Sequence, residues 1–190
     1  MKASELKTIT MGEFIYGKGY MGLFTEGLGN GDVVGIRNSG YIVEFEIKVD
    51  KQDLRNEIKA IRCAIANDMR GCYSNTKFYK HEVYLDVKGR YLNELTGYKP
   101  NLFYFVVPIE FELIAVDGVN GTPYGVYCHG NQEYTLHFAS GDQQRTANGF
   151  KESVKAKPIH KDKITYEQMK SVVRKATTEL YETRKKILKV

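Results

Sequence analysis

The hexapeptide LFYFVV at residues 102–107 is the sequence feature that most narrows the choice of fold. All six residues are apolar or aromatic, and Pro100 and Pro108 bound the run. A continuous run of this kind is typical of a strand that is buried on both faces of its sheet. A chain of 190 residues can enclose one such sheet but is short for two domains. We therefore expect a single α/β domain over residues 1–190, with a central mixed sheet flanked by helices.

A strand, a tight turn, a second strand and a helix are predicted, in that order, within residues 31–59. The strands cover about 31–37 and 41–49, and Gly40 supplies the positive φ that a hairpin turn between them requires. Asp50 is a suitable N-cap for the helix, which we expect to end near residue 67. Its spacing predicts four buried side chains: Leu54, Ile58, Ile61 and Ile65.

The second of these strands places Glu44, Glu46 and Lys48 on one face, and Asp32 on the preceding strand can lie beside them. Hydrolysis of a phosphodiester requires that charge on the phosphate be neutralised and that water become a nucleophile. A divalent metal does both, and Mg²⁺ prefers hard oxygen ligands. Asp32 and Glu46 are therefore candidate ligands, with the backbone carbonyl of Ile47 as a further one. Lys48 is a candidate for holding or polarising the attacking water.

An Asp on one strand, followed by (D/E)-x-K near the end of the next strand and then a helix, resembles the core of the PD-(D/E)XK nuclease superfamily. The motif here is Gly31-Asp32 and then Glu46-Ile47-Lys48, with Gly31 in place of the proline of the superfamily. The resemblance implies a restriction-endonuclease-like αβββαβ core at about residues 20–130. It also implies that Asp32 and Glu46 bind Mg²⁺ (or Mn²⁺) and that Lys48 serves catalysis. The segments that follow look similar to a DNA-repair-associated branch.

Basic residues gather in the last quarter of the chain. The chain carries +5 overall, whereas residues 145–190 hold thirteen Lys or Arg against five Asp or Glu, a net of +8. A basic extension at 150–190 that ends in a helix indicates a polyanionic partner, with DNA as the leading candidate, although a solvated basic helix has the same composition. The candidate nucleic-acid contacts are Lys51, Arg55, Lys59, Lys80, His81, Lys155, Lys157 and Lys161. His81 can instead support the site from a helix expected at 77–88.

Several function classes are disfavoured. No apolar run approaches the ~20 residues that cross a bilayer, which argues against a membrane partner. The N-terminus has no apolar signal segment, and three cysteines without CxxC spacing favour a reducing compartment, with the cytoplasm as default. The four histidines show no HxH or HExxH spacing of a zinc site. Residues 133–149 are polar and without a period, and we expect turns there.

Two interpretations of the acidic strand remain. The alternation EFEIK is also typical of an ordinary solvent-facing strand, in which Glu44 or Glu46 pairs with Lys48 for little stability. Asp32 and the capped helix favour a Mg²⁺-dependent DNA nuclease, acting in DNA repair, recombination or phage DNA processing. The alternative is a catalytically inactive nucleic-acid-binding or interaction module on the same fold. Duplex, branched and single-stranded DNA remain open as substrates, as does the oligomeric state, with a homodimer as one option.

Overall fold

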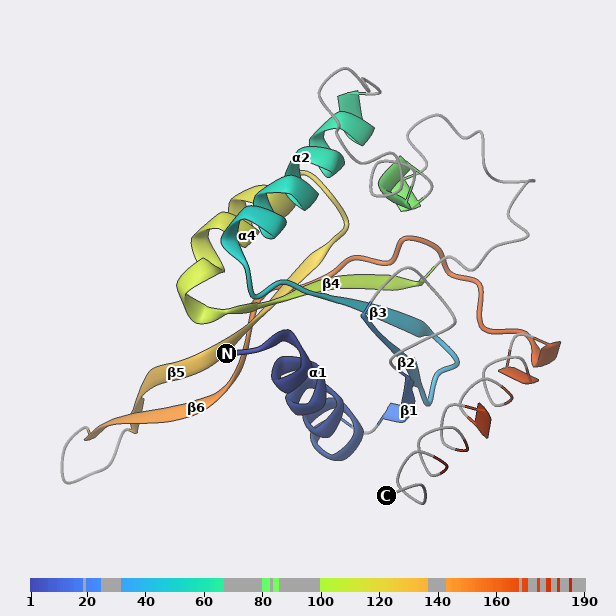
Figure 1. The fold of residues 1–190 in the computed structure, drawn as a ribbon, viewed down its shortest axis with the longest axis horizontal. Coiled ribbons are helices and arrows are strands. Elements are labelled where there is room, and N and C mark those ends of the chain that lie inside the picture. Colours follow the sequence, from blue (N-terminus) through green and yellow to red (C-terminus); the bar gives the residue numbers. More distant parts are fainter. Residues whose placement is uncertain are drawn as a thin grey trace.

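The structure is a computed structural model, and it runs from helix α1 to strand β6 before a C-terminal helical segment (Figure 1). It describes residues 1–18, 20–24, 32–66, 80–82, 84–85, 100–136, 143–167, 169–170, 174, 177–178, 181 and 185. The first half contains α1 (Ala3–Gly12), a π-helical turn (Glu13–Gly17), β1 (Tyr20–Phe24), β2 (Val33–Arg37), β3 (Ile42–Ile47) and α2 (Lys51–Ala66). The second half contains β4 (Leu102–Pro108), a 3₁₀ turn (Ile109–Phe111), α4 (Glu112–Val119), β5 (Gly125–Leu136) and β6 (Gln143–Val154).

The six strands form one mixed sheet in the order β1-β2-β3-β4-β5-β6. β1, β2 and β3 are joined antiparallel, and so are β5 and β6. β3, β4 and β5 run parallel to one another, and such pairs need a crossover connection, to which α2 and α4 contribute. The predicted α/β class with a mixed sheet between helices is confirmed.

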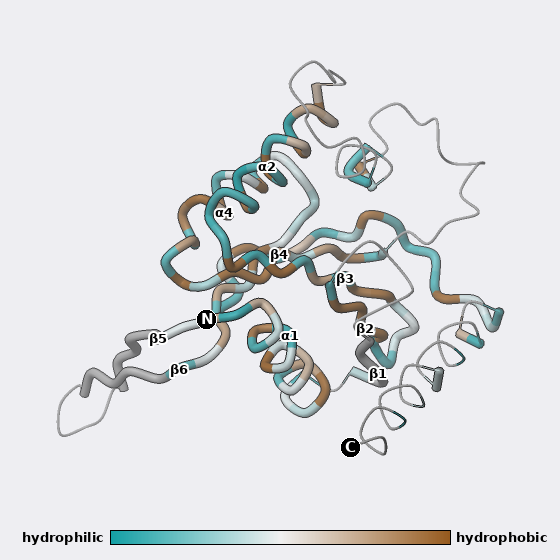
Figure 2. The backbone as a smooth tube through the Cα atoms, in the orientation of Figure 1, coloured by the Kyte–Doolittle hydropathy of each residue, from teal (hydrophilic) through white to brown (hydrophobic). Residues whose placement is uncertain are grey.

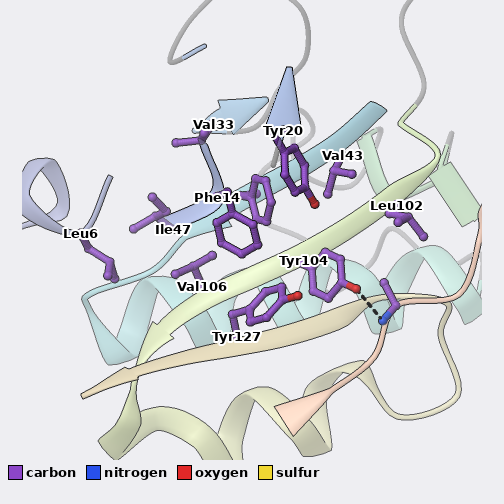
Figure 3. Close-up of a cluster of buried hydrophobic side chains, with 12 residues drawn as sticks. Leu6, Phe14, Tyr20, Val33, Val43, Ile47, Leu102, Tyr104, Val106 and Tyr127 are labelled. Carbon is purple, nitrogen blue, oxygen red and sulfur yellow. Dashed lines mark hydrogen bonds between the residues drawn. The ribbon is translucent and has the colours of Figure 1, made fainter. Parts of the chain in front are cut away.

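Alternate residues of the central strands face two separate cores, because successive side chains of a strand point to opposite faces. The α1 face mixes aromatic and aliphatic side chains, most of which Figure 3 labels. Leu6 and Phe14 pack over Tyr20, Val33, Val43, Phe45, Ile47, Leu102, Tyr104, Val106 and Tyr127. The opposite face lies under α2 and α4, and its core includes Leu54, Ile58, Ile61, Phe103, Phe105, Val107, Ala115, Val119 and Val126. Figure 2 shows hydrophobic residues concentrated along β3 and β4, between these layers.

The elements around β4 largely follow the sequence pattern. All seven residues of β4 are buried, which confirms a strand covered on both faces. α2 begins at Lys51, and the backbone N–H of Asp53 donates to Oδ1 of Asp50 at 2.8 Å, which confirms the predicted N-cap. The prediction that Ile65 is buried is wrong, because it is 44% exposed on the last turn of α2, which projects beyond the sheet (Figure 1).

The prediction of turns at 133–149 is also wrong at 133–136 and 143–149, which are strand, and its remaining positions, 137–142, lie outside the described residues. β5 and β6 pair from Val126↔Val154 to Leu136↔Gln143 and form a long hairpin that projects from the body of the molecule (Figure 1). Backbone hydrogen bonds between adjacent antiparallel strands do not require alternating apolar side chains, so the sequence carries little sign of such an arm.

Two predicted helices fall partly on described residues. Positions 80–82 and 84–85 are helical, and the rest of the expected helix at 77–88 lies outside the described residues. The C-terminal segment is helical at 166–167, 169–170 and further positions to 185, and the N–H of Met169 donates to the carbonyl of Thr165.

Candidate active site

Two ionisable side chains of β3, and that of Lys48 directly after its end, point into the interior, under α2. Glu44, Glu46 and Lys48 are 0%, 6% and 5% exposed. The interpretation of a solvent-facing strand is therefore wrong. Burial of charged groups is costly unless they are paired and hydrogen-bonded, so the partners of these side chains define what the site can do.

Lys48 lies among three carboxylates. Its Nζ is 2.6 Å from Oε1 of Glu46, 3.0 Å from Oδ2 of Asp53 and 3.5 Å from Oε2 of Glu57. Burial acts to lower the pKa of Lys48, but the charges of Glu46 and Glu57 outweigh burial and raise that pKa above its ordinary value. Lys48 is therefore a protonated hydrogen-bond donor in this arrangement.

A second lysine, Lys80, binds the same acids from the helical segment 80–82. Its Nζ lies 3.1 Å from Oε2 of Glu46 and 2.9 Å from Oε1 of Glu57. Each oxygen of Glu46 therefore contacts an ammonium group, one from Lys48 and one from Lys80. Lys80 is 4% exposed, so it lies inside the site. The prediction that Lys80 contacts nucleic acid from the surface is therefore wrong.

His81 is fully buried beside Lys80 and holds Glu57 in place. Its Nε2 is 2.9 Å from Oε1 of Glu57, and its Nδ1 is 3.0 Å from the hydroxyl of Tyr124. Burial lowers the pKa of His81 to about 4, so the ring is neutral at neutral pH. A carboxylate only accepts hydrogen bonds, so Nε2 donates to Glu57 and Nδ1 accepts from Tyr124. Of its two predicted roles, His81 is placed for support of the site and not for contact with a phosphate.

Glu57 and Glu44 are both fully buried, but their pKa values are shifted in opposite directions. Burial acts to raise the pKa of Glu57, but the hydrogen bond from His81 and the charge of Lys80 outweigh burial and hold this pKa well below its ordinary value. Glu44 accepts a hydrogen bond from the hydroxyl of Tyr84 at 2.7 Å through Oε2, and its Oε1 has no hydrogen-bond partner among the described residues. Burial raises the pKa of Glu44 to about 7.

Asp32 lies at the point where the β2–β3 ladder ends. Its N–H donates to the carbonyl of Phe45, and its Oδ2 accepts the N–H of Ile47 at 2.9 Å. The side chain thus takes the place of a backbone acceptor in the ladder. Its Oδ1 is 2.6 Å from Nζ of Lys7, which belongs to α1 on the opposite side of the sheet. The structure therefore sets Asp32 beside Ile47, between Glu46 and Lys48 along β3.

The structure brings only some of the predicted site residues together. Glu46 and Lys48 are in contact, and Asp32 adjoins the backbone between them. Six predicted nucleic-acid contacts are exposed on α2 and after β6: Lys51, Arg55, Lys59, Lys155, Lys157 and Lys161. Five contributors were missed by sequence reasoning: Lys7, Asp53, Glu57, Tyr84 and Tyr124.

A sequence signal exists for only two of the missed groups. Asp53 and Glu57 are four residues apart, so they lie on one flank of α2 beside its apolar stripe. Acids in that position can reach a buried lysine on the underlying strand. Tyr84 and Tyr124 reach the site through contacts between distant segments, which single-sequence periodicity does not report.

The fit of a divalent cation can be judged from the donors present. Within the described ranges, no group of three or more His, Cys, Asp or Glu side chains is gathered to hold a metal ion. Mg²⁺ in enzyme sites is commonly held by one or two carboxylates, with water and substrate phosphate completing the shell. Asp32 accepts the N–H of Ile47, Glu46 directly precedes Ile47, and each of the two carboxylates already contacts an ammonium group. Both are oxygen donors of the type that Mg²⁺ and Mn²⁺ accept.

Comparisons with known proteins bear on the fold. No protein-family model and no curated protein matches the chain. Among solved structures, the chain is similar to SPO1766, a protein of unknown function from Silicibacter pomeroyi, with a TM-score of 0.52 and 12% identity. The match covers 98% of this chain and 92% of that chain, so the likeness spans the whole α/β fold. In the part of the chain that the structure describes, no helix has the length and apolarity needed to span a bilayer.

Proposed function

We propose that this protein is a Mg²⁺- or Mn²⁺-dependent nuclease that hydrolyses phosphodiester bonds of DNA. The observation that carries the proposal is the placement of Asp32 against the amide of Ile47, between Glu46 and Lys48. The order α1, β1, β2, β3, α2, β4 supports it, because this is the αβββαβ order expected of a restriction-endonuclease-like core. The role in DNA repair, recombination or phage DNA processing belongs to the same proposal.

Each residue has a defined task under this proposal. Asp32 and Glu46, with the carbonyl of Ile47, would hold the cation. When bound, that cation supplies charge neutralisation at the phosphate and an activated water. Lys48 donates to Glu46 and Asp53 and would orient the attacking water with its remaining N–H. Lys80 holds the other oxygen of Glu46.

Three further residues hold Lys48 and Lys80 in position. His81 donates to Glu57, and Glu57 in turn contacts both Lys48 and Lys80. Tyr124 sets the tautomer of His81 through Nδ1. His81, Glu57 and Tyr124 are therefore positioning residues, which act on the reaction only through the two lysines.

Exposed cations would track the DNA backbone. Lys155, Lys157 and Lys161 follow the edge strand β6, and Lys51 lies at the start of α2. Binding through such residues weakens as salt rises, because each phosphate contact releases counterions.

One observation favours a second candidate, an inactive nucleic-acid-binding or interaction module. Glu46 and Lys48 are nearly inaccessible, and both oxygens of Glu46 are neutralised by lysines. A charge network that is satisfied in this way can have a purely structural role, in which it holds β3, α2 and the helical residues 80–82 together. This candidate predicts salt-sensitive DNA binding that is independent of metal.

Cleavage of end-labelled DNA distinguishes the two candidates. Purified protein with Mg²⁺ or Mn²⁺ is incubated with single-stranded, duplex, flap and branched substrates. We expect cleavage that EDTA abolishes and that Asp32→Asn and Glu46→Gln remove while DNA binding persists. Asn retains an acceptor for the N–H of Ile47, so Asp32→Asn removes the charge with little effect on the ladder.

The matched control is Glu112→Gln. Glu112 also pairs with a lysine, Lys151 at 2.7 Å, but on the surface between α4 and β6. Cleavage should survive this change. If no substrate is cut with either metal, the nuclease assignment is overturned, and retained binding without cleavage establishes the inactive module.

A further inference from the structure

A pocket of about 370 Å³ lies on the α1 side of the sheet, between the π-helical turn and the turn that joins β2 to β3. A volume of this size is in the range of small-molecule sites. Glu46 and Lys48 point to the opposite side of the sheet, under α2, and neither lines the pocket. The pocket is therefore separate from the candidate active site.

Three aromatic side chains form the apolar wall of the pocket: Phe14 from the π-helical turn, Tyr20 from β1 and Tyr127 from β5. The ring centroid of Phe14 lies 5.4 Å from that of Tyr20 and 5.0 Å from that of Tyr127, and Figure 3 shows the three rings over the sheet. The wall is rigid, because all three rings pack in the core of the α1 face. Aromatic rings favour edge-to-face or offset contact with other rings, so this wall suits a ligand with a flat aromatic group.

Arg37 brings a positive charge to the pocket and has no anionic partner among the described residues. Its Nε donates to the hydroxyl of Tyr20 at 3.1 Å, and its guanidinium carbon lies 5.5 Å from the centre of that ring. Burial raises the pKa of Tyr20, so the hydroxyl stays neutral at neutral pH and does not compensate the charge. A guanidinium has five N–H donors, so four remain for a ligand. Their fork matches two oxygens of a carboxylate or a phosphate.

Three more side chains with hydrogen-bond donors line the pocket: Lys18, Asn38 and Ser39. Lys18 directly follows the π-helical turn and is exposed. Asn38 and Ser39 belong to the β2–β3 turn, which the N–H of Gly40 closes by donating to the carbonyl of Arg37. The described lining thus holds two cations and two neutral donors, and no acid.

This set of donors favours a phosphate over a carboxylate. A phosphate monoester carries about −1.5 to −2 charges at neutral pH and three acceptor oxygens, which matches the two cations, Lys18 and Arg37. A carboxylate has one charge and two oxygens, so it would leave one cation unpaired. The nearby acid Glu152 accepts the hydroxyl of Tyr104 at 2.8 Å and is not part of the described lining.

We propose that this pocket binds a phosphate monoester that carries a flat aromatic group, as a nucleotide does. The phosphate contacts Arg37 and Lys18 beside the β2–β3 turn, and the aromatic group rests on the wall of Phe14, Tyr20 and Tyr127. A free nucleotide and the 5′-phosphorylated end of a strand share this chemistry. The inference does not rest on nuclease activity, because no residue of the candidate active site takes part.

A titration of the full chain with thymidine 5′-monophosphate, in EDTA and without added metal, tests the proposal. Affinity is measured by calorimetry, and the site is located by NMR of the phenylalanine and tyrosine rings. We expect saturable shifts of the ring signals of Phe14, Tyr20 and Tyr127. Thymidine and inorganic phosphate each lack one part of the ligand and should bind at least about tenfold more weakly. Arg37→Gln should weaken binding at least about tenfold, and Lys18→Gln, at an exposed position, about threefold.

The matched control is Arg62→Gln, which removes an exposed arginine of α2 on the other side of the sheet and should leave affinity unchanged. Lys18→Gln alters an exposed side chain, so it tests the charge of the pocket even where Arg37→Gln prevents folding. Two oligothymidylates distinguish the sources of the ligand. Ring shifts with a 5′-phosphorylated strand but not with its 5′-hydroxyl counterpart identify a strand end, and binding of the mononucleotide alone identifies a free nucleotide.

Four outcomes overturn the proposal. The ring signals do not shift at millimolar mononucleotide, or thymidine or inorganic phosphate binds as tightly, or the folded variants at Lys18 and Arg37 bind as the wild type does. The fourth is that the 5′-hydroxyl strand shifts the same rings and displaces the mononucleotide, which would make the pocket part of a general surface for the DNA backbone. The measurement contains no metal and records no cleavage, so its failure is distinct from failure of the nuclease assignment.

Discussion

Replacement of Glu44 by Gln should stabilise the protein at alkaline pH. Glu44 is fully buried, one of its oxygens accepts a hydrogen bond from Tyr84, and the other has no hydrogen-bond partner in the described part of the chain. Gln keeps the shape and the acceptor for Tyr84 but carries no charge. The variant therefore avoids the cost of ionising a carboxyl group in the interior.

The size of the stabilisation by Glu44→Gln follows from the raised pKa of Glu44. Burial raises the pKa of Glu44 from 4.5 to about 7, and this value already includes the attraction of Lys80. Between pH 4.5 and about 7 the folded state binds more protons at Glu44 than the unfolded state, so this residue makes stability fall as pH rises. At ~1.4 kcal/mol per pKa unit, the full effect above pH 7 is about 3 kcal/mol.

Urea unfolding followed by circular dichroism, from pH 4.5 to 8.5, measures the effect. We expect Glu44→Gln to match the wild type near pH 4.5 and to exceed it by up to about 3 kcal/mol at pH 8.5. Tyr84→Phe, which removes the donor to the ionised carboxylate, should shift stability in the opposite direction at pH 8.5. A stability difference for Glu44→Gln that is constant with pH, or that becomes unfavourable at high pH, would refute the reasoning.

Two further predictions concern the same network and use the same unfolding assay. The pKa of His81 is about 4, against 6.5 for an ordinary histidine, so the unfolded state binds more protons between these values and the wild type loses stability as pH falls through this window. His81→Gln should therefore gain about 3 kcal/mol relative to the wild type between pH 7 and pH 4, and an unchanged difference would contradict a neutral buried ring. Lys48→Met should cost about 3–5 kcal/mol, because it leaves Glu46 and Glu57 with one counter-charge fewer, whereas the surface change Lys151→Met should cost less than about 1 kcal/mol. Equal costs for the two lysines would show that the buried network contributes no more than a surface pair.

The sequence predicts the elements whose signal is local. β4 follows from a continuous apolar run, and the start of α2 follows from Asp50, because both depend on neighbouring residues. Ile65 has the correct helical phase for burial, but burial also requires a covering layer, and the last turn of α2 extends beyond the sheet. Phase along a helix can be read from sequence, whereas the extent of the surface beneath it cannot.

In the candidate site, too, only the contact between residues that are close in the sequence can be predicted. Glu46 and Lys48 are two residues apart at the end of β3, where the N–H of Lys48 still donates to the carbonyl of Val106, so their contact follows from strand geometry. Lys80 and His81 look like surface cations in the sequence and are instead buried, because Glu46, Glu57 and Tyr124 converge on them from three distant segments. The partner of Asp32, Lys7, comes from α1 on the other side of the sheet, and no spacing in the sequence reports that contact.

The proposed function requires that Asp32 and Glu46 act together on one divalent cation. A crystal soaked in Mn²⁺ tests this most directly through anomalous scattering. We expect one peak, about 2.1 Å from an oxygen of Asp32 and an oxygen of Glu46, with Nζ of Lys7 displaced from Asp32. Crystals without such a peak, in which Asp32 keeps Lys7 and Glu46 keeps Lys48 and Lys80, would contradict it.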